Sequence, residues 1–212
     1  MTELVFILDR SGSMSGMEQD TIGGFNSMIR KQKQQEGAVL VSTVLFNNHC
    51  QVLHDRVPLE RVQPMTENEY CACGTTALLD AVGGAIKHIG MVHKYARPED
   101  RPEKTLFVIT TDGLENASRK YTYDRVRKMI EHEKTEYGWE FLFLGANIDA
   151  AREAARFGIQ ADRAADYHAD HRGTAVVYET VSDAIGHIRS CQAPLQANWK
   201  RKVDADYRKR GK

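Results

Sequence analysis

The chain alternates between two patterns of apolar residues, short continuous runs and segments in which apolar residues recur at helical spacing. The continuous runs predict strands that are buried on both faces, at residues 4–8, 38–46, 105–111 and 139–144, with a weaker candidate at 164–167. The helical spacing predicts amphipathic helices that include residues 22–29, 78–89, 123–130, 149–157 and 177–188. Strands and helices that alternate in this way indicate a mostly parallel sheet with helices on both faces.

One pair of strands breaks this alternation. A strand is predicted at residues 51–57, directly after the strand at 38–46 and the turn signal Asn47-Asn48, so we expect a hairpin there. The predicted fold is an α/β, doubly wound, Rossmann-like sheet of six strands, mostly parallel with one antiparallel edge strand. Right-handed crossovers bring the carboxyl ends of parallel strands to one edge, where ligands bind in such sheets.

The composition limits the number of domains, the partners and the cellular location that we expect for this chain. The chain has 212 residues, 42% of them hydrophobic, which suits one domain with a full core. Lys+Arg and Asp+Glu both number 29, so the net charge does not indicate a nucleic-acid or membrane partner. Four unevenly spaced cysteines do not suggest a disulfide framework, and neither a signal peptide nor a bilayer-spanning run is expected. We therefore expect a cytoplasmic monomer.

Oxygen-bearing side chains cluster in sequence where two predicted strands end. Asp9, Ser11 and Ser13 come directly after the first apolar run, and Asp112 comes directly after the run at 105–111. Thr76 stands at the start of a predicted helix, after a long polar loop. If these loops converge, they supply five hard oxygen ligands, which Mg²⁺, Mn²⁺ and Ca²⁺ prefer and which disfavour Zn²⁺ or copper.

The order Asp-x-Ser-x-Ser, then Thr, then Asp resembles the metal-ion-dependent adhesion site (MIDAS) of von Willebrand factor A (vWA) domains. The sequences around Ser11 and Thr76 are most similar to those of small, stand-alone prokaryotic members. This resemblance extends over about residues 3–190. It assigns residues 1–192 to a vWA domain and residues 193–212 to a basic C-terminal tail, which we expect to be loosely attached.

The resemblance implies a role for each residue of the site. Ser11, Ser13 and Thr76 would bind the metal through their hydroxyls, whereas Asp9 and Asp112 would act mainly through bound water or exchange with Thr76. Neutral hydroxyl ligands leave the cation with much of its positive charge, so it can accept a carboxylate from another molecule. The predicted function is a Mg²⁺-dependent protein-interaction module, with Mn²⁺ or Ca²⁺ as alternatives, that binds an Asp or Glu of a partner protein and is not an enzyme.

A Mg²⁺-dependent phosphohydrolase on a similar sheet is the alternative function. Enzymes of the haloacid dehalogenase type also begin with a strand that ends in Asp, but they need a second Asp two residues later as acid/base. Ser11 stands at that position. Taken singly, Ser11 and Ser13 also fit a simple turn, and Thr76 fits a helix N-cap.

Three other features need a structure to interpret them. Cys71 and Cys73 precede Thr76 and fit either solvent-facing thiols or a redox or soft-metal pair. His168 and His171 fit either a polar loop or a second metal site. Glu115, near the metal edge, is expected to be solvated. Among the three loops of the site, the long one before Thr76 is the one we expect to move.

Overall fold

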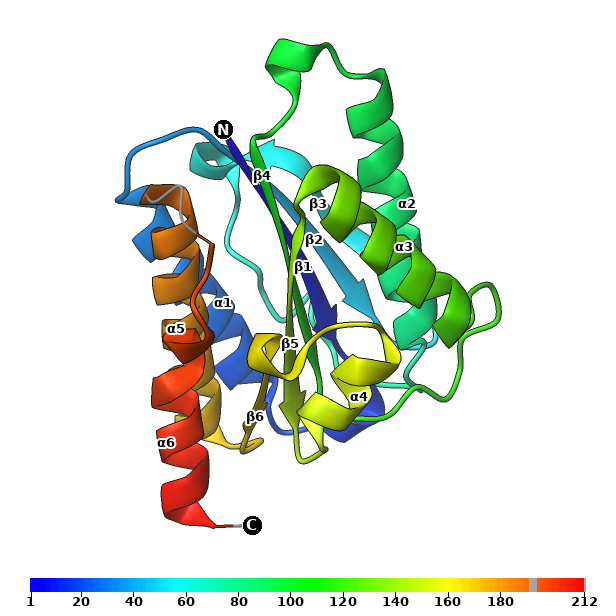
Figure 1. Ribbon diagram of the computed structural model, residues 1–212. Helices are drawn as coiled ribbons and strands as arrows, with labels where there is room; N and C mark the ends of the chain where they lie inside the picture. The colour runs from blue at the N-terminus through cyan, green and yellow to red at the C-terminus, as the bar shows by residue number, and fades with distance from the viewer. Residues whose placement is uncertain (191–193, 212) are drawn as a thin grey trace.

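The computed structural model describes residues 1–190 and 194–211. Strands and helices alternate along the chain (Figure 1), apart from one hairpin and several short 3₁₀ turns. The strands are β1 (Thr2–Asp9), β2 (Val39–Phe46), β3 (Cys50–Pro58), β4 (Lys104–Thr111), β5 (Glu140–Ala146) and β6 (Ala164–Tyr167). The helices are α1 (Glu18–Lys33), α2 (Leu78–Tyr95), α3 (Tyr123–Tyr137), α4 (Ala150–Arg156), α5 (His171–Ser190) and α6 (Arg201–Arg210). The 3₁₀ turns are η1 (Gly12–Met14), η2 (Leu59–Arg61), η3 (Pro98–Asp100), η4 (Ala161–Arg163) and η5 (Ala197–Lys200).

The strands form one sheet in the order β3-β2-β1-β4-β5-β6. Every neighbouring pair is parallel except β2 and β3, so β3 is an antiparallel edge strand. This confirms the predicted doubly wound, six-stranded sheet. The chain builds the sheet outward from β1 to β3 and then returns to place β4 on the other side of β1. The strand order therefore reverses between β1 and β4, which is where such sheets bind ligands.

Alternate residues of β1 pack into two separate cores. Leu4, Phe6 and Leu8 contribute to the core shared with α1 and α5, whereas Val5 and Ile7 contribute to the core under α2, α3 and α4. Figure 1 shows these helices in layers on opposite faces of the sheet. All five side chains are fully buried. A strand covered on both faces needs an apolar residue at every position, which explains the uninterrupted apolar run.

The long segment between β3 and α2 is more deeply packed than its polar sequence predicts. Leu59, Val62, Met65 and Tyr70 are all buried, in the core that also contains α1. Asn26 of α1 holds this segment in place, because its side-chain amide donates to the Met65 carbonyl and accepts from the Met65 N–H, both at 2.8 Å. The buried residues of the predicted polar loop are therefore part of the core, while most of its polar residues remain exposed.

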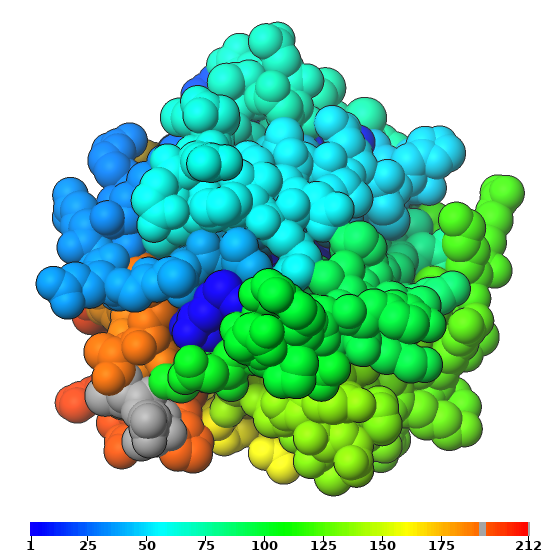
Figure 2. Space-filling model, turned by 90° about the horizontal axis from the view of Figure 1, so that it is seen from above, coloured from blue at the N-terminus to red at the C-terminus, as the bar shows by residue number. Residues whose placement is uncertain are grey.

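Figure 2 views the end of the molecule where the parallel strands begin. The first residues (dark blue) reach the surface here, close to the segments that enter β2 and β4. Just inside, Glu3 is fully buried, and its carboxylate accepts a hydrogen bond from Arg56 Nε at 2.6 Å and pairs with His93 Nε2. The carboxyl ends of the strands, which carry the candidate site, lie at the opposite end.

The C-terminal segment is not the loosely attached tail that its basic composition predicted. Residues Arg201–Arg210 form α6, which packs against α5 and β6 (Figure 1). Val203 is only 1% exposed. Asp206 is paired at 2.8 Å with both Arg172 of α5 and Arg210. The prediction failed because Lys202 and Arg210 pair with acidic side chains, Lys202 with Glu179 and Asp183 of α5 and Arg210 with Asp170 and Asp206.

Two features of the sequence lie outside the described residues. They are the predicted boundary between domain and tail, at residues 192 and 193, and Cys191. Within the described part of the chain, no helix is both long enough and apolar enough to cross a membrane.

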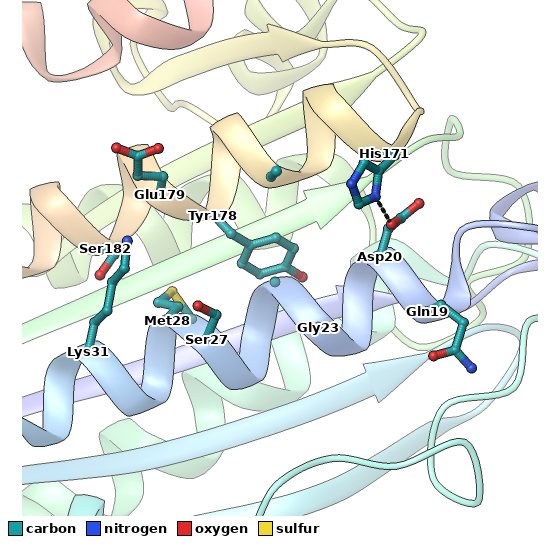
Figure 3. A pocket seen from close by; sticks show the side chains of 12 residues that line it. Gln19, Asp20, Gly23, Ser27, Met28, Lys31, His171, Tyr178, Glu179 and Ser182 are labelled. Carbon is teal, nitrogen blue, oxygen red and sulfur yellow. Dashed lines mark hydrogen bonds and ion pairs between the residues drawn. The ribbon is translucent and has the colours of Figure 1, made fainter.

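Helices α1 and α5 pack closely because a glycine on α1 leaves room for an aromatic ring. The groove between them has a volume of about 370 Å³. Figure 3 shows Tyr178 of α5 lying across α1, and His171 paired with Asp20 at one end of the groove. A Cβ atom on Gly24 would lie 2.3 Å from Tyr178 Cδ2, whereas a Cβ on the adjacent Gly23 would meet nothing within 4 Å.

The two glycines give a matched pair of substitutions. We expect Gly24→Ala to lower the free energy of unfolding by about 1–3 kcal/mol, because Tyr178 must move out of a packed position. Gly23→Ala should raise it by about 0.5–1 kcal/mol, since alanine loses less backbone entropy in a helix. Urea unfolding monitored by circular dichroism measures both values. Equal effects of the two substitutions would contradict the packing of Tyr178 against Gly24.

The docking of α6 can be tested in the same assay. Val203→Glu places a charge in a buried position, and we expect it to cost more than about 2 kcal/mol of stability. Ala205→Glu adds the same charge at an exposed position of the same helix and should change stability by less than about 0.5 kcal/mol. A Val203→Glu protein as stable as the wild type would mean that α6 does not contribute to the core.

Candidate metal centre

The pairing of β1 with β4 positions the two acidic residues of the site. Asp9 is the last residue of β1, and Asp112 directly follows Thr111, the last residue of β4. The strands are parallel and in register, with Leu8 opposite Thr110. Both carboxylates therefore lie at the carboxyl ends of neighbouring strands, where the strand order reverses.

Hydrogen bonds connect four of the five predicted residues. Ser13 Oγ donates to Asp112 Oδ1 at 2.6 Å and lies 3.1 Å from Ser11 Oγ. The Ser11 N–H donates to Asp9 Oδ1 at 2.7 Å. Ser11 precedes the short turn η1, but its hydroxyl makes no capping hydrogen bond. A simple turn or cap therefore does not explain why the two serine hydroxyls lie together, with that of Ser13 bonded to Asp112.

Thr76 completes the group from a third loop. It is only 3% exposed, and a Cβ atom on Gly113 would lie 3.3 Å from Thr76 Oγ1 and 3.8 Å from Ser13 Oγ. The absence of a side chain at Gly113 thus leaves space between these hydroxyls. The N-cap position of α2 is Ala77, and no side chain caps the helix from there, so the alternative of Thr76 as the N-cap is wrong. The structure brings all five predicted residues together.

Burial makes the two carboxylates costly to ionise. Asp9 is 1% exposed. Burial raises the pKa of the Asp9 carboxyl above its usual value, hydrogen bonds from Thr111 Oγ1 (2.6 Å) and the Ser11 N–H oppose the rise, and the nearby charge of Asp112 adds to it. Burial also raises the pKa of the Asp112 carboxyl, against the hydrogen bond from Ser13. A cation near these two acids would stabilise their ionised forms.

The chemistry of the donor set fits a hard divalent cation. The site offers three hydroxyls and two carboxylates, all oxygen donors, as Mg²⁺, Mn²⁺ and Ca²⁺ prefer. Within residues 1–190 and 194–211, no group of three or more His, Cys, Asp or Glu side chains is placed to hold a metal. The nitrogen and sulfur donors that typify zinc and copper sites are therefore not gathered in this part of the chain.

Two residues that support the site were missed in the sequence. The buried Tyr70 donates its hydroxyl hydrogen bond to the main-chain carbonyl of Asp9. Asn116 Oδ1 accepts a hydrogen bond from the Thr76 N–H at 2.9 Å. No signal in the sequence indicated Asn116, because the Thr76 N–H that it accepts from lies before the N-cap position of α2 and is not one of the free N–H groups of that helix.

The cysteines near the site are free thiols. Cys50, Cys71 and Cys73 are exposed and unpaired. The N–H of Cys73 donates to the Arg10 carbonyl at 2.9 Å, and its Sγ accepts from Asn47 Nδ2 at 3.3 Å. Cys73 thereby helps to join the loop before Thr76 to the loop after Asp9.

The two histidines of the second candidate metal site have other contacts. His168 stacks on Tyr207 of α6, with ring centroids 4.6 Å apart. His171 Nδ1 pairs with Asp20 of α1. Each histidine therefore helps to join α5 or its preceding loop to a neighbouring helix, as the alternative of a polar loop allows.

Comparison with known proteins agrees with this fold. No family model matches the sequence, and no curated protein matches it. Among solved structures, the vWF domain of the type V pilus tip protein Mfa5 from Porphyromonas gingivalis superposes with a TM-score of 0.65 at 9% identity, covering 91% of this chain and 97% of that one. A vWA protein from Catenulispora acidiphila superposes with a TM-score of 0.58 at 12% identity, over 86% of this chain and 42% of that one.

A third similar structure holds a metal. Proximal thread matrix protein 1 from the mussel byssus, with a zinc-occupied MIDAS motif, has a TM-score of 0.58 at 12% identity, over 85% of this chain and 44% of that protein. The chain thus spans less than half the length of this relative. At such identities the superpositions establish the architecture alone. The chain has the fold of a von Willebrand factor A domain.

Proposed function

We propose that this domain binds Mg²⁺ and uses the bound ion to hold an acidic side chain of a partner protein. The observation that carries the proposal is the convergence of the Ser11, Ser13 and Thr76 hydroxyls with the Asp9 and Asp112 carboxylates at one sheet edge. Pilus and byssus proteins of the same fold support an interaction role.

The depth of each residue suggests its task. Asp9 is buried, and its two carboxylate oxygens accept from the Ser11 N–H and Thr111 Oγ1, so it supplies negative charge and orients Ser11. Ser13 is exposed and Asp112 partly exposed, so the site opens to solvent on their side. Ser11, Ser13 and Thr76 would hold the ion through neutral hydroxyls. When bound, such an ion supplies a strong positive charge that attracts a carboxylate from another molecule.

We propose Mg²⁺ ahead of Zn²⁺ because the donor set contains only oxygen atoms. Mn²⁺ and Ca²⁺ have the same preference and are the next candidates. Zinc occupies the MIDAS motif in the byssus protein, so affinities for several ions should be measured side by side.

The site is poorly arranged for the alternative, phosphohydrolase chemistry. A nucleophilic Asp must present a carboxylate oxygen to its substrate, but both oxygens of Asp9 accept hydrogen bonds and the side chain is 1% exposed. Position 11, where the acid/base carboxylate would stand, is a serine whose hydroxyl faces Ser13. We therefore propose a non-enzymatic domain. The exposed free thiols of Cys50, Cys71 and Cys73 fit a reducing location such as the cytoplasm.

Removal of a single site hydroxyl tests the proposed ligands. We expect Ser13→Ala and Thr76→Ala each to weaken Mn²⁺ and Mg²⁺ binding by about tenfold or more, or about 1.4 kcal/mol, because each would lose a direct ligand. Ser15→Ala is the matched control, since Ser15 is exposed and two residues beyond Ser13. Isothermal titration calorimetry with Mg²⁺ and electron paramagnetic resonance with Mn²⁺ measure the affinities. Equal affinity in Ser13→Ala, Thr76→Ala and the wild type would contradict these assignments.

Capture of a partner tests the interaction role. Immobilised domain should retain its partner from native lysate in the presence of Mg²⁺ and release it in EDTA, because the ion would bridge the two proteins. Asp9→Ala should lose capture and Ser15→Ala should keep it, with circular dichroism verifying that both variants are folded. Substitution of the partner's metal-binding Asp or Glu by Ala should have the same effect as EDTA. Capture that is unchanged by EDTA would overturn the proposal.

A further inference from the structure

The loops that carry Thr76 and Asp112 are joined by contacts outside the candidate metal centre. One side of these contacts is residues 76–83, at the start of α2, and the other is residues 115–121, just after Asp112. We call this pair of segments the interlock.

Asn116 holds the backbone of Thr76 from both sides. Its Oδ1 accepts from the Thr76 N–H at 2.9 Å, and its own N–H donates to the Thr76 carbonyl at 3.1 Å. The Asn116 side chain is exposed and contributes nothing to the core. These two bonds fix the backbone that carries the Thr76 hydroxyl relative to the loop that carries Asp112.

Glu115 and Ser118 cap α2 in place of its own N-terminal residues. Glu115 Oε2 accepts from the Leu79 N–H at 2.8 Å, and Ser118 Oγ accepts from the Asp80 N–H at 2.9 Å. Glu115 also accepts from the N–H groups of Ala117 and Ser118. It is therefore an organised structural group and not the solvated side chain that the sequence led us to expect. The first turn of α2 depends on these acceptors because Ala77 has none to offer.

Asp80 of α2 in turn accepts hydrogen bonds from the segment after Asp112. Its carboxylate accepts from the N–H groups of Arg119, Lys120 and Tyr121, at 2.9–3.0 Å. The Tyr121 ring then lies against Gly83, where a Cβ atom would be only 2.4 Å from Tyr121 Cδ1. Each segment thus provides acceptors for the other, and a separation of the two would leave partly buried N–H groups without partners.

We propose that the interlock presets the metal centre, with Asn116 as the positioning residue for Thr76. This inference rests on the proposed function. In it, the Thr76 and Asp112 loops form one rigid unit before any cation binds, and they stay together when a partner carboxylate arrives. The length of the loop before Thr76 favours movement of that loop, but the interlock opposes it.

The serine loop is joined to this unit by fewer contacts, one of which is the hydrogen bond from Ser13 Oγ to Asp112. Its backbone links to the loop before Thr76 are the Gly12 N–H to the Gly74 carbonyl, at 3.0 Å, and the Cys73 N–H to the Arg10 carbonyl, at 2.9 Å. Any adjustment of the site to an ion therefore falls mainly on the serines, while Thr76 and Asp112 stay in place.

Amide hydrogen exchange in EDTA tests the preset geometry without a metal. We expect the N–H groups of Thr76 and Leu79 to be protected in the metal-free wild type. Asn116→Ala should speed exchange at Thr76 by about tenfold, because its acceptor is lost. Asn116→Asp, which keeps an acceptor oxygen, should restore protection. Thr76 N–H exchange that is unprotected in EDTA and becomes slow only with Mg²⁺ would overturn the inference.

Mn²⁺ affinity tests the consequence for the site. We expect Asn116→Ala to bind Mn²⁺ about 10–100-fold more weakly, as is usual when a residue that orients a metal ligand is removed. Gln32→Ala is the matched control, because the Gln32 amide also makes two hydrogen bonds, donating to the Ser182 carbonyl and accepting from Arg189 Nη1, both at 2.9 Å, but lies near the end of α1 that is away from the site. It should bind Mn²⁺ like the wild type.

The outcomes separate this inference from the proposed function. Equal Mn²⁺ affinity in Asn116→Ala and the wild type, or equal weakening in Asn116→Ala and Gln32→Ala, would overturn the positioning role of Asn116. A wild-type domain that binds no Mn²⁺ would instead overturn the proposed function, and the exchange of the Thr76 N–H in EDTA would still decide whether the two loops are held together.

Discussion

The parallel pairing of β1 with β4 brings two carboxylates to neighbouring strand ends, and the rest of the site follows from that constraint. Asp9 and Asp112 carry like charges in a partly desolvated place, where their mutual repulsion and burial both oppose ionisation. The surrounding groups reduce this cost: Ser13 and Thr111 donate hydrogen bonds to the carboxylates. A divalent cation would reduce it further, which is the physical basis of the proposed metal centre.

The distribution of charge in this site favours binding over catalysis. The more deeply buried acid, Asp9, has both oxygens engaged in hydrogen bonds, and the groups that we propose as direct ligands of the ion are neutral hydroxyls. An ion held in this way keeps a positive charge that an external Asp or Glu can satisfy. The interlock between the start of α2 and residues 115–121 suits the same task, because a preset site loses little freedom when it binds its ligand.

Those parts of the structure that depend on local pattern were predictable. The strands β1 and β4 are covered on both faces, so their central positions, residues 4–8 and 106–109, are all apolar and the runs are easy to recognise. Asp9, Ser11, Ser13, Thr76 and Asp112 could be selected because they stand at element boundaries in a fixed order, and the structure brings them together. Their role as metal ligands stays a prediction.

Features that depend on distant partners could not be predicted. Tyr70 lies in a polar segment. It is buried because Asn26 fixes that segment by hydrogen bonds and because its apolar residues pack in the core beside α1. The basic α6 docks because Val203 is buried and Asp206 pairs with Arg172 of α5, contacts that no period in the sequence reveals.

Anomalous diffraction from crystals grown with Mn²⁺ would test the central claim most directly. The account predicts a single strong anomalous peak bounded by the hydroxyls of Ser11, Ser13 and Thr76, at oxygen-coordination distances of about 2.0–2.3 Å. No peak at this sheet edge, or a peak held by other residues, would contradict it.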